Sequence, residues 1–167
     1  EVMGRKNEIM KRALGLDYQE FEGKGLLFDY EGMMEKAGYS IEEVRNIQTE
    51  TSVGNTPLIE LKNLSAAARK LAGPGKGARI FIKDEASNPS GSFKARRASV
   101  SCYYARQKGY EGVIAATSGN YGAAVASQAN MRNLKCIIVQ EVFDSRRVGQ
   151  PEILEKGRKC EAYGAEV

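Results

Sequence analysis

The stretch that decides the fold is residues 83–97, which read KDEASNPSGSFKARR. A β-rich run at residues 79–83 leads into the turn-forming sequence Asn-Pro-Ser-Gly at residues 88–91, and a helical pattern follows the turn. Lys94 is therefore predicted to lie in the first turn of a helix. Because the unpaired N–H groups of a helix N-terminus carry partial positive charge, a partly desolvated ammonium group is destabilised there. The neutral amine is a nucleophile that condenses with aldehydes, although a lysine at this place can also simply point into solvent.

A second stretch, TSGNYG at residues 117–122, follows a buried-type strand at 112–116. It opens a helix that is predicted over residues 121–131. Backbone N–H groups, two hydroxyl groups and one amide converge here at a helix N-terminus, which suits a carboxylate or a phosphate. The alternative is an ordinary helix cap with glycines that form the turn.

From residue 79 onward the chain alternates between strand and helix patterns. Such alternation predicts an α/β fold with an open parallel sheet and right-handed crossovers. Ligands of open α/β sheets bind at the carboxyl ends of the strands. We therefore expect Lys94 and the 117–122 stretch to lie at the same edge of the sheet and to form one site. The predicted elements are strands 79–83, 112–116 and 134–139, helices 92–108, 121–131 and 151–163, and a further strand beginning at 166–167.

Three segments together resemble the fold-type II pyridoxal 5′-phosphate (PLP) enzymes, a family that includes tryptophan synthase β, threonine synthase, threonine dehydratase and the cysteine synthases. They are GNTPL at 54–58, NPSGSFK at 88–94 and TSGN at 117–120, in the family's order. The resemblance covers about residues 51–167. It implies the small domain of that fold, a three-layer αβα open parallel sheet, and PLP as cofactor.

The resemblance also implies roles for individual residues. Lys94 looks like the lysine that forms the Schiff base with PLP. Asn120 would donate a hydrogen bond to the ring hydroxyl oxygen of PLP. The substrate carboxylate would be bound by Thr117, Ser118, Gly119 and Tyr121. Tyr121 departs from the smaller residues or histidine that often follow this asparagine in the family.

A closer likeness to one branch of the family is found at residues 5–10, 83–86, 92–98, 115–126 and 149–152. Members of this branch cleave 2-amino-4-oxopentanoate with coenzyme A to acetyl-CoA and alanine during ornithine breakdown. This likeness implies an amino acid substrate, coenzyme A, a small α subunit as partner, and a homo- or hetero-oligomer. The alternatives are a β-eliminating or β-replacing lyase, of the threonine dehydratase, threonine synthase or diaminopropionate ammonia-lyase type, and a non-catalytic binding relative.

The chain is expected to divide into a helical N-terminal arm, residues 1–50, and the N-terminal part and small domain of the PLP fold, residues 51–167. The family's phosphate-binding glycine loop and its group facing the pyridine nitrogen match no residue of this sequence. We therefore expect the chain to be part of a longer subunit, to be inactive by itself and to bind PLP weakly.

Residues 73–77 are expected to be a surface loop. Ser40 and Glu43 fit a capping box. The other expectations are a helix at 2–14, an irregular segment at 16–30, a helix from the capping box to about 47, a strand at 58–61 and a helix at 64–71.

Composition excludes several classes of protein. A net charge of +4 with scattered basic residues gives no nucleic-acid-binding stripe. The lack of histidine excludes Ser-His and Cys-His catalysis and histidine metal ligation within this chain, and no metal is expected. No apolar run is long enough to cross a membrane and no signal-peptide core is seen, so a cytoplasmic protein is expected.

Three widely spaced cysteines predict buried, reduced thiols rather than acyl carriers. Arg96 and Arg97 could attract coenzyme A phosphates, but a salt bridge is expected for at least one of them.

Overall fold

The computed structural model describes residues 5–25 and 27–167. The chain forms two compact units, Glu1–Asn46 and Ile47–Val167, which we describe separately. The predicted division between residues 50 and 51 into an arm and a PLP-fold domain stays a prediction.

The first unit is helical. Helix α1 (Lys6–Leu14) is followed by a 3₁₀ turn, η2 (Tyr18–Phe21), and by helix α2 (Tyr30–Lys36). The Phe28 ring lies 4.9 Å from the Tyr18 ring and 4.7 Å from the Tyr30 ring, so aromatic packing links these short elements. The predicted first helix is confirmed over Lys6–Leu14, and its start at residues 2–4 lies outside the described residues. Helix α2 was not predicted.

Helix α3 (Ile41–Thr49) begins in the first unit and runs into the second. The Ser40 hydroxyl accepts a hydrogen bond from the backbone N–H of Glu43 at 3.2 Å, which confirms Ser40 as the N-cap residue.

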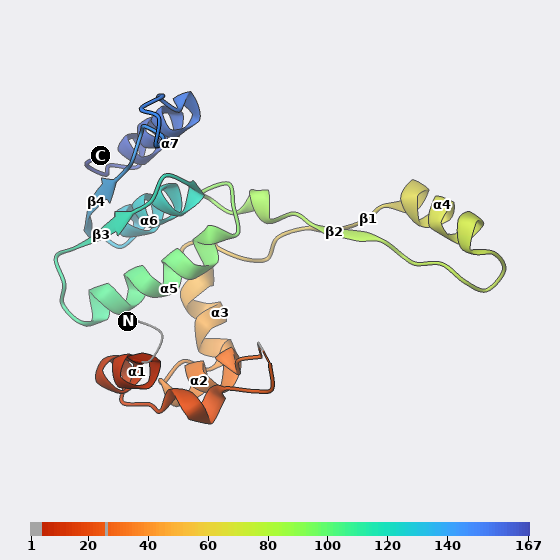
Figure 1. Ribbon diagram of the computed structural model, residues 1–167, viewed down its shortest axis with the longest axis horizontal. Helices are drawn as coiled ribbons and strands as arrows, with labels where there is room; N and C mark the ends of the chain where they lie inside the picture. The colour runs from red at the N-terminus through yellow and green to blue at the C-terminus, as the bar shows by residue number, and fades with distance from the viewer. Residues whose placement is uncertain (1–4, 26) are drawn as a thin grey trace. The chain divides into compact units, whose positions relative to one another are not determined.

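The second unit contains two small sheets (Figure 1). In the first, β1 (Leu58–Glu60) pairs antiparallel with β2 (Phe81–Lys83), and helix α4 (Lys62–Ala72) connects the two strands. The prediction that residues 79–83 join the parallel sheet is therefore wrong. The physical reason is that a strand's sequence pattern fixes its extended conformation but not its partner. Here the pairing with β1 continues beyond the strands, through Leu61 N–H to Ile80 O and Asp84 N–H to Pro57 O, each at 2.9 Å.

The second sheet is parallel, as predicted. Strand β3 (Gly112–Ala116) pairs with β4 (Lys135–Val139), and a parallel bridge between Ile137 and Glu166 adds a third segment at the predicted place. Helices α5 (Lys94–Gln107), α6 (Asn120–Met131) and α7 (Pro151–Ala162) accompany this sheet (Figure 1). The predicted α/β fold class is confirmed.

The core of the second unit is built from small side chains. Helix α6 is buried continuously from Gly122 to Ala129, and it packs against α5, α7 and the parallel sheet. A Cβ atom at Gly122 would lie 3.0 Å from Thr117 Cγ2 and 3.2 Å from Ile138 Cγ2, so this approach needs a glycine. The predicted buried, reduced cysteines are confirmed, because Cys102, Cys136 and Cys160 are all free and buried. Within the described residues, no helix combines the length and the apolar character needed to cross a membrane.

Candidate active site

Lys94 is the first residue of α5, two residues later than the predicted start of that helix. The chain reaches it through a tight turn in which the Gly91 N–H donates to Asn88 O at 2.7 Å. Gly91 has a φ of +77°, a conformation that favours glycine. The Ser92 hydroxyl accepts a hydrogen bond from the Lys94 backbone N–H at 3.3 Å. The turn and Ser92 therefore fix the backbone from which the lysine side chain departs.

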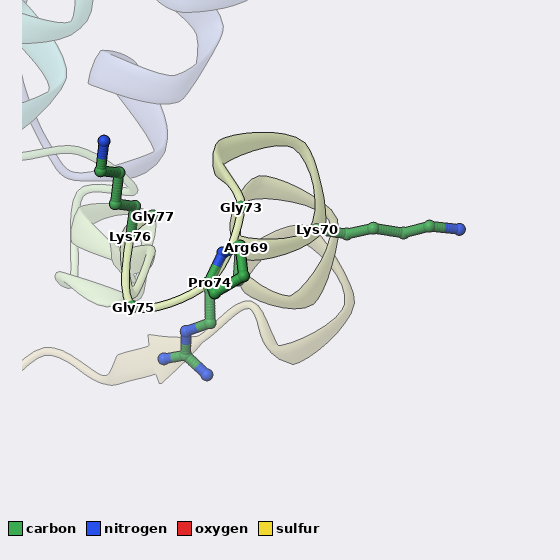
Figure 2. Close-up of a pocket in the computed structure, with 7 residues that line it drawn as sticks. All are labelled: Arg69, Lys70, Gly73, Pro74, Gly75, Lys76 and Gly77. Carbon is green, nitrogen blue, oxygen red and sulfur yellow. The ribbon is translucent and has the colours of Figure 1, made fainter.

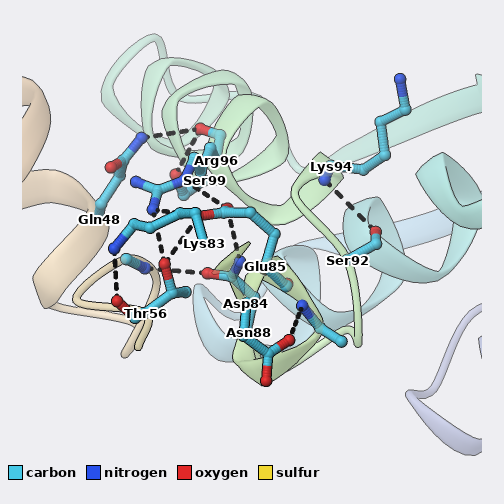
Figure 3. A network of polar contacts seen from close by, with 12 residues as sticks. Gln48, Thr56, Lys83, Asp84, Glu85, Asn88, Ser92, Lys94, Arg96 and Ser99 are labelled. Atoms are coloured by element: carbon cyan, nitrogen blue, oxygen red, sulfur yellow. Dashed lines mark hydrogen bonds and ion pairs between the residues drawn. The ribbon is translucent and has the colours of Figure 1, made fainter. Parts of the chain in front are cut away.

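Among the residues that the structure describes, the Lys94 amine has no polar partner. Its Nζ atom lies 4.4 Å from the centroid of the exposed Phe93 ring, and within the described part of the chain no hydrogen bond or ion pair involves it. Figure 3 shows the Lys94 side chain extending away from the neighbouring polar network. Lys94 is a half-buried residue, and an amine without such partners is available to react with a carbonyl group.

The second stretch connects β3 to α6. The Thr117 N–H donates to Val139 O at 2.9 Å, and the Thr117 hydroxyl accepts from the Gly119 N–H at 3.1 Å. Gly119 is the N-cap residue of α6, whose first turn contains no acidic residue. A Cβ atom at Gly119 would meet no atom within 4 Å, so open space lies beside this loop. The partial positive charge of the helix N-terminus and the open space together suit an anionic group.

A contact between α5 and α6 joins the two stretches. The guanidinium carbon of Arg97 lies 4.9 Å from the centroid of the Tyr121 ring. Arg97 is one turn after Lys94, and Tyr121 directly follows Asn120, so the first turns of α5 and α6 lie side by side. We predicted that the two stretches lie at the same edge of one sheet. This prediction is wrong, because β2 and β3 belong to different sheets. Helix packing brings the stretches together instead.

A polar network beside Lys94 was missed by the sequence analysis (Figure 3). The Glu85 carboxylate accepts hydrogen bonds from Arg96 Nε at 2.7 Å and Arg96 Nη2 at 2.8 Å, and from the Thr56 hydroxyl at 2.7 Å. These bonds, those of Arg96 first, lower the pKa of Glu85 from 4.5 to about 2, and the carboxylate raises the pKa of Arg96. The expectation of a salt bridge for at least one of the two arginines is confirmed by Arg96. The only sequence signals for this network were the matching segments that contain its members.

Helix α7 contacts the other side of the turn before Lys94. Lys159 Nζ donates to Ser90 O at 2.9 Å, and the Tyr163 hydroxyl donates to Pro89 O at 3.0 Å. The buried Ser90 hydroxyl has no hydrogen-bond partner within the described residues. No sequence signal predicted these contacts, which span about 70 residues of chain.

The glycine-rich loop after α4 lies by an open hollow of about 600 Å³. Figure 2 shows Arg69, Lys70 and Lys76 extending in different directions around it. The loop follows the C-terminal end of α4, where carbonyl groups rather than N–H groups are unpaired. The loop therefore offers no converging donors for a phosphate, as expected of a surface connection.

Residues 49–167 match the protein family described as "Pyridoxal-phosphate dependent enzyme". The chain belongs to this family. It is 69% identical over 166 residues to the 2-amino-4-ketopentanoate thiolase beta subunit of Acetoanaerobium sticklandii, with 99% of this chain and 35% of that protein covered. A beta subunit of the same name from an unknown prokaryotic organism is 72% identical, and the match again covers 99% of this chain and 35% of that protein. The chain spans about a third of the length of these relatives.

More distant members of the family share the fold. The threonine synthase of Bacillus sp. (strain ULM1) is 32% identical over 144 residues, covering 86% of this chain and 35% of that protein. Among solved structures, maize serine racemase has a TM-score of 0.54 at 28% identity, with 76% of this chain and 35% of that one covered. Cysteine synthase from Entamoeba histolytica has a TM-score of 0.55 at 27% identity, covering 70% and 32%. The predicted fold-type II PLP fold is thereby confirmed, and PLP is the cofactor of the family.

The residues that the structure brings together fit PLP. The unpaired amine of Lys94 suits its aldehyde, and the Asn120 side chain, which is exposed at the start of α6, can donate to a ring oxygen. The open space beside Gly119 and the N–H groups at the start of α6, which have no partner within the helix, suit the carboxylate of an amino acid.

Proposed function

We propose that this chain is the N-terminal, lysine-bearing part of the PLP-dependent β subunit of a 2-amino-4-oxopentanoate thiolase. The observation that carries the proposal is the identity of 69% and 72% with two such subunits over 99% of the chain, against 32% with a threonine synthase. The reaction transfers the acetyl group of 2-amino-4-oxopentanoate to the sulfur of coenzyme A and releases alanine, a step of ornithine degradation in the cytoplasm. The β-subunit names of the relatives support a small α subunit as partner within a larger oligomer.

Each candidate residue has a proposed task. PLP, when bound, supplies an aldehyde for an amine and an electron sink for the bonds at the substrate's Cα atom. Lys94 Nζ would hold the cofactor at its aldehyde carbon, and the lysine amine would take and return the Cα proton of the substrate. The Asn120 side chain would orient the cofactor by a hydrogen bond to the hydroxyl oxygen of the cofactor ring. The substrate carboxylate is bound by Thr117, Ser118, Gly119 and Tyr121.

Acyl transfer directly to coenzyme A is proposed, without a cysteine carrier. The coenzyme A thiolate attacks the C4 carbonyl carbon, the C3–C4 bond breaks, and the three-carbon remainder gains a proton at C3 to leave as alanine. The chain's own thiols do not suit the carrier role. Burial raises the pKa of Cys102 to about 12 and that of Cys136 to about 11, and Cys160 is fully buried.

Borohydride reduction of the PLP-loaded protein at its full native length, followed by peptide mass mapping, tests the lysine assignment. We expect a pyridoxyl group on Lys94, and loss of this adduct and of activity in Lys94→Ala. Lys108→Ala is a matched control, because Lys108 lies at the other end of α5 with its amine 5.4 Å from the Tyr104 ring centroid, but away from the site. An adduct on another lysine, or none in a folded protein, contradicts the assignment.

Omission of coenzyme A distinguishes the thiolase from the lyase alternative. The thiolase forms alanine and acetyl-CoA from 2-amino-4-oxopentanoate only when coenzyme A is present. Turnover of a β-substituted amino acid or of threonine without coenzyme A would instead favour a lyase of the threonine dehydratase or threonine synthase type. A trapped Lys94 with activity in neither assay would favour the non-catalytic relative.

A further inference from the structure

An ion pair two residues after Lys94 ties the start of α5 to the preceding turn. Arg96 is the third residue of α5, and both Nε and Nη2 of its guanidinium bind the two carboxylate oxygens of Glu85, at 2.7 and 2.8 Å. Such a bidentate pair fixes the relative orientation of its partners as well as their distance. Glu85 is the first residue of the 3₁₀ turn η3 (Glu85–Ser87), so the pair spans the connection from β2 to α5.

Two further residues lock the same carboxylate. The Thr56 hydroxyl donates to Glu85 Oε1 at 2.7 Å, and Asn88 Nδ2 donates to Glu85 Oε2 at 3.1 Å. Asn88 Oδ1 accepts from the Gly54 N–H at 2.9 Å. The network thus unites the segment at residues 54–56, the turn at 85–88 and the first turn of α5, and its bonds to Glu85 leave that carboxylate little freedom to move.

Apart from the Ser92 hydroxyl, which accepts from the Lys94 N–H, the first turn of α5 has few supports of its own, so the network anchors it. Its N-cap residue, Phe93, makes no side-chain cap, and the first turn contains no acidic residue. Arg96 also accepts through its backbone oxygen from Gln48 Nε2 at 3.2 Å and from the Ser99 hydroxyl at 2.9 Å. Arg96 is therefore the most heavily anchored residue of this turn.

We propose that Glu85 and Arg96 are positioning residues that hold the Lys94 amine in the orientation in which it bonds to the cofactor aldehyde; this rests on the function proposed above. The Lys94 side chain makes no polar contact with any residue that the structure describes, so its direction follows from the backbone of the first turn. Figure 3 shows Arg96 and Lys94 leaving the same turn in different directions, one into the network and the other away from it. On the far side, the contacts of Lys159 and Tyr163 hold the turn that precedes the lysine.

The test uses Glu85→Gln, which keeps the shape of the side chain and removes its charge, and Arg96→Lys, which keeps the charge and removes the bidentate geometry. Glu60→Gln is the matched control. Glu60 accepts from Nε and Nη2 of Arg79 at 3.1 and 3.0 Å in the same bidentate manner, on the β1–β2 pair. Folding of each variant, made at full native length, is checked by circular dichroism.

Three measurements are compared: the Kd for PLP, the yield of borohydride-trapped Lys94, and the pH midpoint of the visible absorbance of the bound cofactor. We expect Glu85→Gln and Arg96→Lys to weaken PLP binding about tenfold, to reduce trapping and to shift the pH midpoint, because a misplaced reacting group is costly. Glu60→Gln should change none of them. If Glu85→Gln fails to fold, the same three measurements on Arg96→Lys test the proposal.

The positioning role would be overturned if the two variants only lowered the unfolding temperature and left the trapping yield, the Kd for PLP and the pH midpoint unchanged. The ion pair would then be merely structural. Failure of the proposed function looks different: the unmodified protein itself would then show no adduct on Lys94. In that case, the rate of hydrogen exchange of the backbone N–H groups at residues 94–97 still measures how the Glu85–Arg96 pair affects the first turn of α5. Exchange as slow in Glu85→Gln as in the unmodified protein would also overturn the inference.

Discussion

The Glu85–Arg96 pair should make stability depend on pH in a defined acid range. The network lowers the pKa of Glu85 from 4.5 to about 2, so the folded protein binds this proton more weakly than the unfolded chain does. Unfolding therefore takes up a proton between about pH 4.5 and pH 2. The stabilisation by the carboxylate is fully present above this range and is lost as the pH falls through it.

The size of the effect follows from the same shift. A pKa difference of one corresponds to about 1.4 kcal/mol, so the difference between 4.5 and about 2 sets an upper limit of about 3.5 kcal/mol for Glu85. The Glu85 and Arg96 side chains are 23% and 35% exposed, so solvent screens their attraction. We therefore expect Glu85→Gln to lower the free energy of unfolding by about 1–2 kcal/mol near pH 7, or the melting temperature by about 2–8 °C.

The assay is thermal unfolding of the unmodified protein and of Glu85→Gln at a series of pH values from 7 to 2, followed by circular dichroism. The difference between the two melting temperatures should be constant above about pH 5 and should shrink steadily toward pH 2. Glu60→Gln again serves as the control for the loss of a carboxylate that forms a bidentate pair elsewhere. A difference that stays constant down to pH 2 would refute the reasoning, because it would show that the Glu85 proton is bound equally in both states.

Two further predictions concern the core. Thr51→Val should destabilise the protein by about 1–3 kcal/mol in urea unfolding, because the Thr51 hydroxyl donates at 2.7 Å to Oε1 of the fully buried Gln128, which would lose this donor. Ser101→Ala, at an exposed position of α5, should stay within about 0.5 kcal/mol, and equal effects of the two would contradict the prediction. Cys102, Cys136 and Cys160 should resist iodoacetamide at pH 8 in the folded protein and react after unfolding, because all three are buried and burial raises their pKa values. Peptide mass mapping measures this, and rapid labelling of any of the three in the folded state would disprove it.

The parts of the fold that could be predicted from the sequence are those fixed by neighbours in the chain. Ser40 marks the start of α3 through one hydrogen bond to Glu43, three residues away. Pro151 occupies the first position of α7, where its missing N–H group is not needed. Gly109, with a φ of +76°, directly follows the C-cap residue of α5. Each signal acts within a few residues, so a single sequence contains it in full.

The parts that could not be predicted depend on contacts between distant segments. Strand β2 has the composition of a strand, but its choice of β1 rather than β3 as partner is a tertiary property. Asn88 was interpreted only as a turn former, whereas its side chain also binds the Gly54 N–H, 34 residues away. The charges of Glu85 and Arg96 alone do not show that they meet, since most exposed charges have no fixed partner.

The candidate site shows that two segments can lie close for a reason other than the one expected from the sequence. Lys94 and the Thr117–Gly119 loop were expected together because both follow strands, but those strands lie in different sheets. What brings them together is the packing of α5 on α6, through Ala98 and Cys102 on one helix and the run from Ala123 to Ala126 on the other. Small side chains let two helices approach closely along their length, and their first turns then lie side by side. The information about the site therefore resides in the alanine-rich sequence of α6 as well as in the two motifs, since larger side chains at these positions would separate the two helix starts.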